Sequence, residues 1–189
     1  MLNTAITLFS GKGYETVSMR DIADMVGIKA ASIYNHFSSK RDILKGMFEF
    51  YYREHQAAFP DMEKLLSMVE TEPILEVIAN MSYHFPPEIQ DKMDRILLIA
   101  SQRISLDKDC ELFIREHFFE PLIKLWSSIL NRAVELGRLE PFDIDSFVRL
   151  VTFYAFSAAE LNSTVMKTSL EQWLGGLDLL YSLLKPAKN

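Results

Sequence analysis

The stretch Asp21-Ile-Ala-Asp-Met-Val-Gly-Ile-Lys-Ala-Ala-Ser-Ile-Tyr-Asn-His-Phe37 decides the fold of the first part of the chain. Its pattern is that of a helix-turn-helix, in which two short helices cross at a steep angle. Ala23 is small where the second helix must pass closely, and Gly27 stands four residues later, where the tight turn requires a positive φ. Four apolar side chains supply the contacts between the two helices: Ile22, Val26, Ile28 and Ile33. The exposed positions of the second helix are those that can enter the major groove of DNA.

Signals for further helices lie on both sides of this stretch. A preceding helix has one apolar face, made by Leu2, Ala5, Ile6 and Phe9. The segment Gly11–Gly13 is predicted to close that helix with a glycine in the left-handed region. Ser18-x-x-Asp21 and Ser39-x-x-Asp42 each predict a capping box, in which a hydroxyl and a carboxylate three residues later satisfy the first N–H groups of a helix. An apolar stripe from Ile43 to His55 then predicts one long helix that Pro60 interrupts.

The rest of the chain is predicted to be helical, because apolar residues recur at spacings of three and four rather than two. The predicted fold class is therefore all-α. Pro121 lies inside one of the predicted helices and is expected to kink or split it. The breaks are set mainly by prolines, glycines and polar runs, and they predict helices near residues 62–69, 73–83, 87–105, 108–137, 143–163 and 169–184.

Composition indicates a folded intracellular protein. Of the 189 residues, 49% are hydrophobic and 24% are charged, which suits a globular core under a polar surface. The longest apolar runs are only a few residues long, far short of the roughly 20 residues that cross a bilayer. The N-terminus lacks the pattern of a secretory signal, and the single Cys110 excludes an internal disulfide. These features predict a protein of the cytoplasm.

The distribution of charge favours DNA binding by the first part of the chain alone. The net charge of −6 at first argues against a nucleic-acid partner, since phosphates are neutralised by Lys and Arg. Residues 1–45, however, hold six basic and four acidic side chains, a net charge of +2, so that the remainder carries −8. A mildly basic head on an acidic body suits a protein whose head alone contacts DNA.

The sequence around the helix-turn-helix resembles the signature of the TetR family of transcriptional regulators. The similarity covers residues 1 to about 47 and rests on Gly-Tyr-Glu-Thr-Val-Ser-Met-Arg-Asp-Ile-Ala, on Ile-Tyr-Asn-His-Phe and on Ser-Lys-Arg-Asp-Ile-Leu. It implies a three-helix DNA-binding head at residues 1–45, followed by a helical domain at 46–189 that binds an effector and dimerises. It also implies a regulator, most often a repressor, that leaves a palindromic operator when a small molecule binds.

The resemblance assigns roles to individual residues of the head. Contacts to phosphates are expected from Thr16, Ser18, Tyr34, His36 and Lys40, and Arg20 is expected near the DNA backbone. Base contacts are expected from the second helix of the motif, from Lys29, Ala30, Ser32 and Asn35. One position departs from the family pattern, because Lys29 stands where a Ser or Thr usually caps this helix. The missing cap is expected to cost about 1 kcal/mol.

The end of the chain predicts a dimer. Apolar residues surround the helix predicted near 143–163, which indicates burial on more than one side. Together with the final predicted helix it would form a four-helix bundle across a two-fold axis. The alternative, that both are core helices of a monomer, stays open. The predicted interface residues are Val151, Ala155, Ala158, Ala159, Trp173, Leu177, Leu180 and Tyr181.

The resemblance places an inducer among the middle helices, where large adaptable side chains are frequent. Such side chains suit an apolar or aromatic ligand, although they can equally be ordinary core. Two polar residues could orient the ligand, with an ion-paired arginine and a surface histidine as the respective alternatives. The candidate ligand-binding residues are Phe59, Met81, Phe85, Arg103, Phe113, His117, Trp126, Phe153 and Tyr154.

Two other functions stand as alternatives. For an enzyme, the histidines show no metal-ligand spacing, and there is neither a glycine-rich phosphate loop nor a nucleophile elbow. Asp107-x-Asp109-x-Glu111 resembles the start of a calcium loop, but Leu112 occupies the position that requires Gly. No catalytic activity, cofactor or metal is therefore expected. The second rival is a helical dimeric interaction protein that retains the head fold but not sequence-specific DNA binding.

Overall fold

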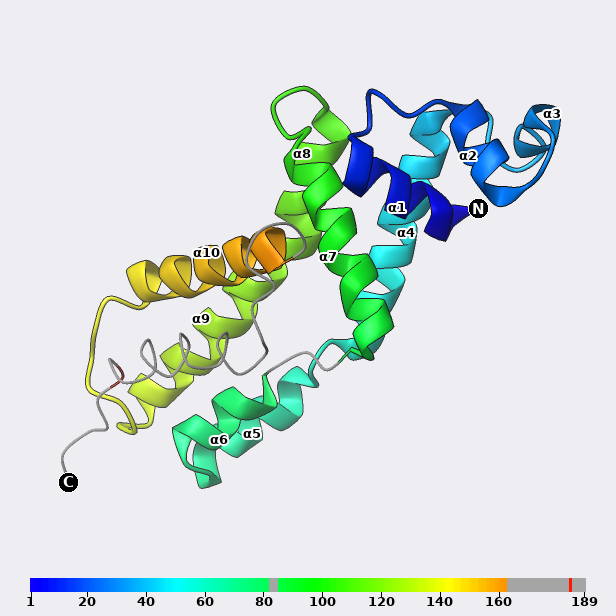
Figure 1. Ribbon diagram of the computed structural model, residues 1–189. Helices are drawn as coiled ribbons and strands as arrows, with labels where there is room; N and C mark the ends of the chain where they lie inside the picture. The colour runs from blue at the N-terminus through cyan, green and yellow to red at the C-terminus, as the bar shows by residue number, and fades with distance from the viewer. Residues whose placement is uncertain (82–84, 163–183, 185–189) are drawn as a thin grey trace. The chain divides into compact units, whose positions relative to one another are not determined.

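The computed structural model describes residues 1–81, 85–162 and 184, and within them the chain is helical with no β-sheet (Figure 1). This confirms the predicted all-α class. The predicted last helix, near 169–184, lies outside the described residues except for Leu184. In chain order the elements are α1 Leu2–Lys12, α2 Met19–Val26, α3 Ala30–Ile33, α4 Lys40–Ala58, α5 Met62–Thr71, α6 Ile74–Asn80, α7 Pro87–Ser101, α8 Lys108–Ile114, the π-helical segment η1 Arg115–Phe119, α9 Glu120–Glu135 and α10 Ile144–Asn162.

The chain forms two compact units that are discontinuous in sequence. Unit 1 comprises residues 1–57 and 85–114, and unit 2 comprises residues 58–84 and 115–189. The three helices of the predicted head therefore share a unit with most of α4 and with α7 and α8. No described helix is both long enough and apolar enough to cross a membrane.

Unit 1 is built on the apolar face predicted for the first helix. Ala5, Ile6 and Phe9 of α1 are buried, and α1 packs against both α7 and α2. Each fully buried Ile or Phe side chain contributes about 1.5–3 kcal/mol relative to an exposed one. The largest fully buried side chains of this unit are Ile6, Phe9, Ile22, Ile33, Ile43, Leu44, Met47, Ile96, Ile99 and Ile114.

Unit 2 has a separate core in which α9 packs against α5 and α10. The face of α9 that points inward is apolar at helical spacing, and α6 packs on α5 beside it. The cluster includes Leu65, Val69, Val77, Ile78, Leu125, Ile129, Leu130, Ala133, Val148 and Val151.

The helix boundaries agree with the capping signals in part. The Ser18–Asp21 capping box is complete and confirms the predicted start of α2. At the start of α4 the Ser39 hydroxyl accepts from the N–H of Asp42 at 3.2 Å, but the carboxylate of Asp42 accepts from the N–H of Ser38 at 3.0 Å. Gly13 has a positive φ of 84° with a ψ of 142°, so it closes α1 outside the left-handed helical region that was predicted. The capping box predicted at Ser39 is thus formed only in part, because the Ser39 hydroxyl caps the N–H of Asp42 but the carboxylate of Asp42 accepts from Ser38 instead of Ser39.

The helix predicted at 108–137 is divided into α8, η1 and α9. The second boundary falls between Phe119 and Glu120, so that Pro121 is the second residue of α9, which confirms the split predicted from this proline. In an uninterrupted α-helix the N–H of residue 121 would donate to the carbonyl of His117, and proline has no N–H. The π-helical turn at Arg115–Phe119 changes the hydrogen-bond register at this point, which accommodates the missing donor within a continuing helix.

Gly46, in the middle of α4, is expected to be replaceable by alanine with a gain in stability. A Cβ at this position would lie 3.5 Å from a ring carbon of Phe37 and 3.6 Å from a methyl group of Leu2, both ordinary contacts. Because glycine costs a helix interior about 0.5–1 kcal/mol relative to alanine, Gly46→Ala should raise the free energy of unfolding by that amount. The measurement is urea unfolding followed by circular dichroism. The control Gly27→Ala, at φ +80°, should lower the same quantity, and a loss of stability in Gly46→Ala would contradict the packing described here.

Candidate DNA-binding surface

The loop before α2 is organised by hydrogen bonds of its own side chains. The N–H of Ser18 donates to the carboxylate of Asp21 at 2.7 Å, and the N–H of Asp21 donates back to the Ser18 hydroxyl at 3.1 Å. The hydrogen bonds from Ser18 hold the pKa of Asp21 below its ordinary value. The hydroxyl of Thr16 donates to the backbone carbonyls of Lys12 and Gly13. The loop therefore has a defined conformation without DNA.

The turn between α2 and α3 has the geometry that its glycine predicted. Gly27 adopts φ 80° and ψ 29°, in the left-handed region, and the N–H of Ile28 donates to the carbonyl of Ala23 at 3.0 Å. Ala23 and Ile33 are both fully buried, so the two helices are in close contact here. This confirms the predicted helix-turn-helix.

The second helix of the motif is short and lacks a side-chain cap. Lys29 occupies the N-cap position with φ −65° and ψ 141°, and its side chain makes no capping hydrogen bond, as its sequence indicates. After Ile33 the chain continues as a turn, in which the N–H of Asn35 donates to the Ser32 carbonyl at 3.3 Å. The predicted base-contacting side chains of Lys29 and Asn35 are exposed, while Ala30 and Ser32 are partly buried. Ala31, which was not predicted to contact bases, is also exposed on this helix.

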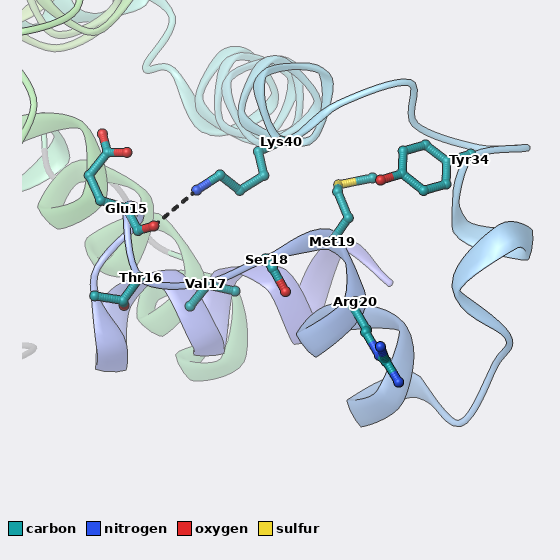
Figure 2. A pocket seen from close by; sticks show the side chains of 8 residues that line it. All are labelled: Glu15, Thr16, Val17, Ser18, Met19, Arg20, Tyr34 and Lys40. Atoms are coloured by element: carbon teal, nitrogen blue, oxygen red, sulfur yellow. Dashed lines mark hydrogen bonds between the residues drawn. The ribbon is translucent and has the colours of Figure 1, made fainter.

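A surface pocket of about 390 Å³ lies at the start of α2 (Figure 2). It brings together five residues predicted to lie at the DNA backbone: Thr16, Ser18, Arg20, Tyr34 and Lys40. Three further lining residues, Glu15, Val17 and Met19, were not predicted. Their neighbours Thr16 and Ser18 could have indicated them, since a loop that carries two contacts also presents the residues between and beside them. His36, the sixth predicted contact near the backbone, is exposed but does not line the pocket.

Lys40 is held at this pocket by the loop before α2. Its ammonium group donates to the carbonyl oxygens of Tyr14 at 2.8 Å and Glu15 at 3.3 Å, and the second of these bonds joins residues drawn in Figure 2. The same nitrogen lies 4.5 Å from the centroid of the Tyr14 ring. Because Lys40 begins α4, these contacts fix the loop to the fourth helix.

Arg20 is the most exposed cation of the pocket. Its guanidinium lies 3.9 Å from the carboxylate of Asp24, one turn along α2, and both side chains are largely exposed. An exposed pair of this kind contributes little stability and is readily opened. Arg20 is therefore available to a phosphate.

The candidate ligand-binding residues are divided between the two units. Phe85, Arg103 and Phe113 belong to unit 1, and the other six belong to unit 2. Phe113 is buried, with its ring stacked on Phe48 at a centroid distance of 4.0 Å. In unit 2, Met81 and Trp126 are core residues, Phe59 and Tyr154 pack against that core, and Phe153 is exposed near Phe119. Arg103 is ion-paired with Glu15 and Asp107. His117 lies in η1.

The predicted dimer residues are described only in part. On α10, Val151 is buried in the core of unit 2 and Ala155 is partly buried. Ala158 and Ala159 lie on the same helix, but their side chains are outside the described part of the chain, as are Trp173, Leu177, Leu180 and Tyr181. The predicted interface therefore stays a prediction.

The fold and this surface together define a helix-turn-helix protein with a larger helical body. Residues 1–47 match the sequence profile of the bacterial regulatory proteins of the tetR family. The repressor KstR2 of Mycolicibacterium smegmatis is 30% identical over 162 residues, which span 80% of this chain and 72% of that protein. The chain therefore belongs to the tetR family of bacterial regulatory proteins.

Two further similarities concern about half of the chain and the whole fold. IcaR, a negative transcriptional regulator of a biofilm operon in Staphylococcus aureus, is 54% identical over 103 residues, about half of each chain. The crystal structure of PfmR, a regulator of the same family from Thermus thermophilus, superposes with a TM-score of 0.65 at 25% identity and covers 95% of both chains. The architecture is thus shared along almost the whole length.

Proposed function

We propose that this chain is a sequence-specific DNA-binding transcriptional repressor. The observation that carries the proposal is the convergence of Thr16, Ser18, Arg20, Tyr34 and Lys40 on one pocket at the start of α2, in the unit that presents α3. The similarity to proteins named as repressors, KstR2 and IcaR, supports repression rather than activation.

The pocket is suited to a phosphate of the DNA backbone. The first N–H groups of a helix have no partner within the helix, and the helix dipole places partial positive charge there. At α2 this end is accompanied by the guanidinium of Arg20, the phenol of Tyr34 and the ammonium of Lys40. The hydroxyls of Thr16 and Ser18 already donate within the loop, so a phosphate oxygen would compete with their present acceptors. Together these donors would fix the register of the head on the duplex.

In this proposal base recognition belongs to α3 and the turn that follows it. Lys29 and Asn35 would donate to base edges in the major groove, with Ala30 and Ser32 making shorter contacts. His36 would contact a phosphate beyond them. Residues 1–45 act as the DNA-binding head, and residues 46–189 as the body.

We further propose that the body dimerises and binds a small apolar or aromatic inducer. Ala155 of α10 would lie at or near the two-fold axis, whereas Val151 is left out of the interface because its side chain is already buried in the core of unit 2. Dimeric heads would read half-sites of a palindrome about one helical turn apart. The inducer would contact Phe59, Tyr154 and their neighbours in unit 2. Arg103 is left out of this site because its guanidinium is engaged within unit 1. The proposal includes neither catalysis nor a cofactor and places the protein in the cytoplasm.

Selection of random DNA duplexes by the purified protein at low salt tests the proposal. Sequencing of the recovered duplexes is expected to give a palindrome with half-sites spaced by one turn of DNA or a multiple of it. The Lys40→Met variant should fail to enrich that site, while Lys45→Met, which removes a cation from the exposed surface of α4, should enrich it. Absence of any enriched site would overturn sequence-specific binding and favour the interaction protein.

A further inference from the structure

A network of charged side chains ties the loop before α2 to the corner between α7 and α8. Arg103, just beyond α7, pairs with the carboxylate of Glu15 in the loop, and its guanidinium carbon lies 4.0 Å from the centroid of the Tyr14 ring. The same guanidinium lies 3.4 Å from the carboxylate of Asp107. Tyr14 and Glu15 are thus each held by a residue about 90 positions away in the sequence.

The network extends to the start of α4. Arg41 binds the carboxylate of Asp109 at 2.6 Å and lies 3.9 Å from that of Asp107. Asp107 therefore stands between the two arginines and also accepts from the N–H of Asp109 at 3.0 Å. All of these residues belong to unit 1, so the contacts lie within one compact body.

Burial makes the central pair different from an ordinary surface ion pair. The side chains of Arg103 and Asp107 are only 13% and 11% exposed, whereas Glu15 is 71% exposed. Burial by itself would lower the pKa of Arg103, but the hydrogen bond and charge of Glu15 and the carboxylate of Asp107 outweigh it and raise that pKa. A guanidinium held in this way is not available to bind a phosphate directly.

The position of Glu15 gives the network a functional meaning. A carboxylate that lines the proposed phosphate pocket would repel DNA if its charge were uncompensated. The pairing with Arg103 neutralises it and at the same time anchors the loop one residue before Thr16. The network carries two basic side chains, Arg41 and Arg103, against three acidic ones, so it adds no net attraction for DNA.

We propose that Arg103 is a positioning residue for DNA binding, which fixes the loop of Thr16 and Ser18 through Tyr14 and Glu15 without contacting DNA. This inference rests on the proposed function, because it concerns the geometry of the same phosphate contacts. It assigns to the α7–α8 corner a role in setting DNA affinity.

The test is binding of the selected duplex by Arg103→Met, which keeps an unbranched apolar stem but removes the guanidinium and with it the ion pair. The expected dissociation constant is about 10-fold higher than that of the unchanged protein, as for residues that act on binding through others. The decisive variant is the double substitution Glu15→Gln with Arg103→Met, which restores the local charge balance. A positioning role predicts that the double variant stays about 10-fold weaker, and recovery of full affinity would show that Arg103 only masks the charge of Glu15.

The salt dependence of binding separates positioning from direct contact. Removing a cation that contacts phosphate decreases the magnitude of the slope of log affinity against log salt concentration by about 0.9. Lys40→Met is expected to show this decrease, whereas the double variant should keep the slope of the unchanged protein. A shallower slope in the double variant would mean that Arg103 touches DNA and would overturn the proposal.

Separate control measurements test whether the variants fold and whether the unchanged protein binds DNA. The thermal midpoints of the double variant and the unchanged protein are compared by circular dichroism. If the double variant does not fold, the single variant Glu15→Gln carries the test. Loss of an exposed carboxylate alone should strengthen DNA binding, whereas loss of the loop's anchor, as the positioning role predicts, should weaken it. Failure of the unchanged protein to bind any duplex would refute the proposed function, whereas binding by it and equal binding by these variants would refute only the positioning role.

Discussion

Replacing Phe9 with alanine is expected to lower the free energy of unfolding by about 3–5 kcal/mol, the cost of removing a large aromatic side chain from a packed core. Phe9 is fully buried on the face of α1 that meets α7 and α2. Its ring also lies 4.9 Å from the ring of Tyr14, so the cavity would open directly beneath the loop that leads to Thr16. Since whole domains are stable by only about 5–15 kcal/mol, this single change should bring the protein close to unfolding at physiological temperature.

Urea unfolding followed by circular dichroism measures this loss. Leu106→Ala serves as the matched control, because Leu106 lies in the same unit but is 76% exposed, so that its truncation should change stability by less than about 0.5 kcal/mol. A cost below about 1 kcal/mol for Phe9→Ala would mean that α1 is not packed as described.

The local structure of the head could be predicted from the sequence because its determinants are short in range. The positive φ of Gly27 follows from a turn of fixed length, and the cap at Ser18 follows from a hydroxyl and a carboxylate three residues apart. The break near Pro121 follows from a missing N–H, but its form, a π-helical turn, is shown only by the structure. At Ser39 the same spacing predicted a full capping box, but the carboxylate of Asp42 reaches Ser38 instead.

The contacts of Lys40 and Arg103 could not be predicted in the same way. Lys40 bonds to the backbone of residues about 25 positions earlier, and a sequence pattern does not show which carbonyl groups the fold brings near it. The sequence offers Arg103 as a polar residue that could orient the inducer, with an ion-paired arginine as the alternative, and the structure bears out the alternative. One partner, Asp107, is only four residues away, but the other, Glu15, is 88 residues away, and only the packing of α1 on α7 brings it to Arg103.

Lys29→Asp is expected to make the head more stable and DNA binding much weaker. Lys29 has the backbone conformation of an N-cap residue but makes no capping hydrogen bond. An aspartate there can accept from the first N–H groups of α3, which should raise the free energy of unfolding by about 1 kcal/mol. In the proposed complex the same carboxylate replaces a base-contacting cation at the entrance to the major groove. The lost contact and the new repulsion together should weaken binding of the selected duplex about 100-fold or more.

The opposite signs of these two effects make Lys29 a sharp test of how the head meets DNA. A variant that is weaker in binding because it is damaged should also unfold more easily, whereas Lys29→Asp should unfold at higher urea. Lys29→Ser is the matched control, because it supplies a cap without a negative charge and should bind only about 10-fold more weakly than the unchanged protein. If Lys29→Asp gained stability and still bound the duplex within about threefold of the unchanged protein, the start of α3 would not face the groove. The surface that reads DNA would then have to lie elsewhere on the head.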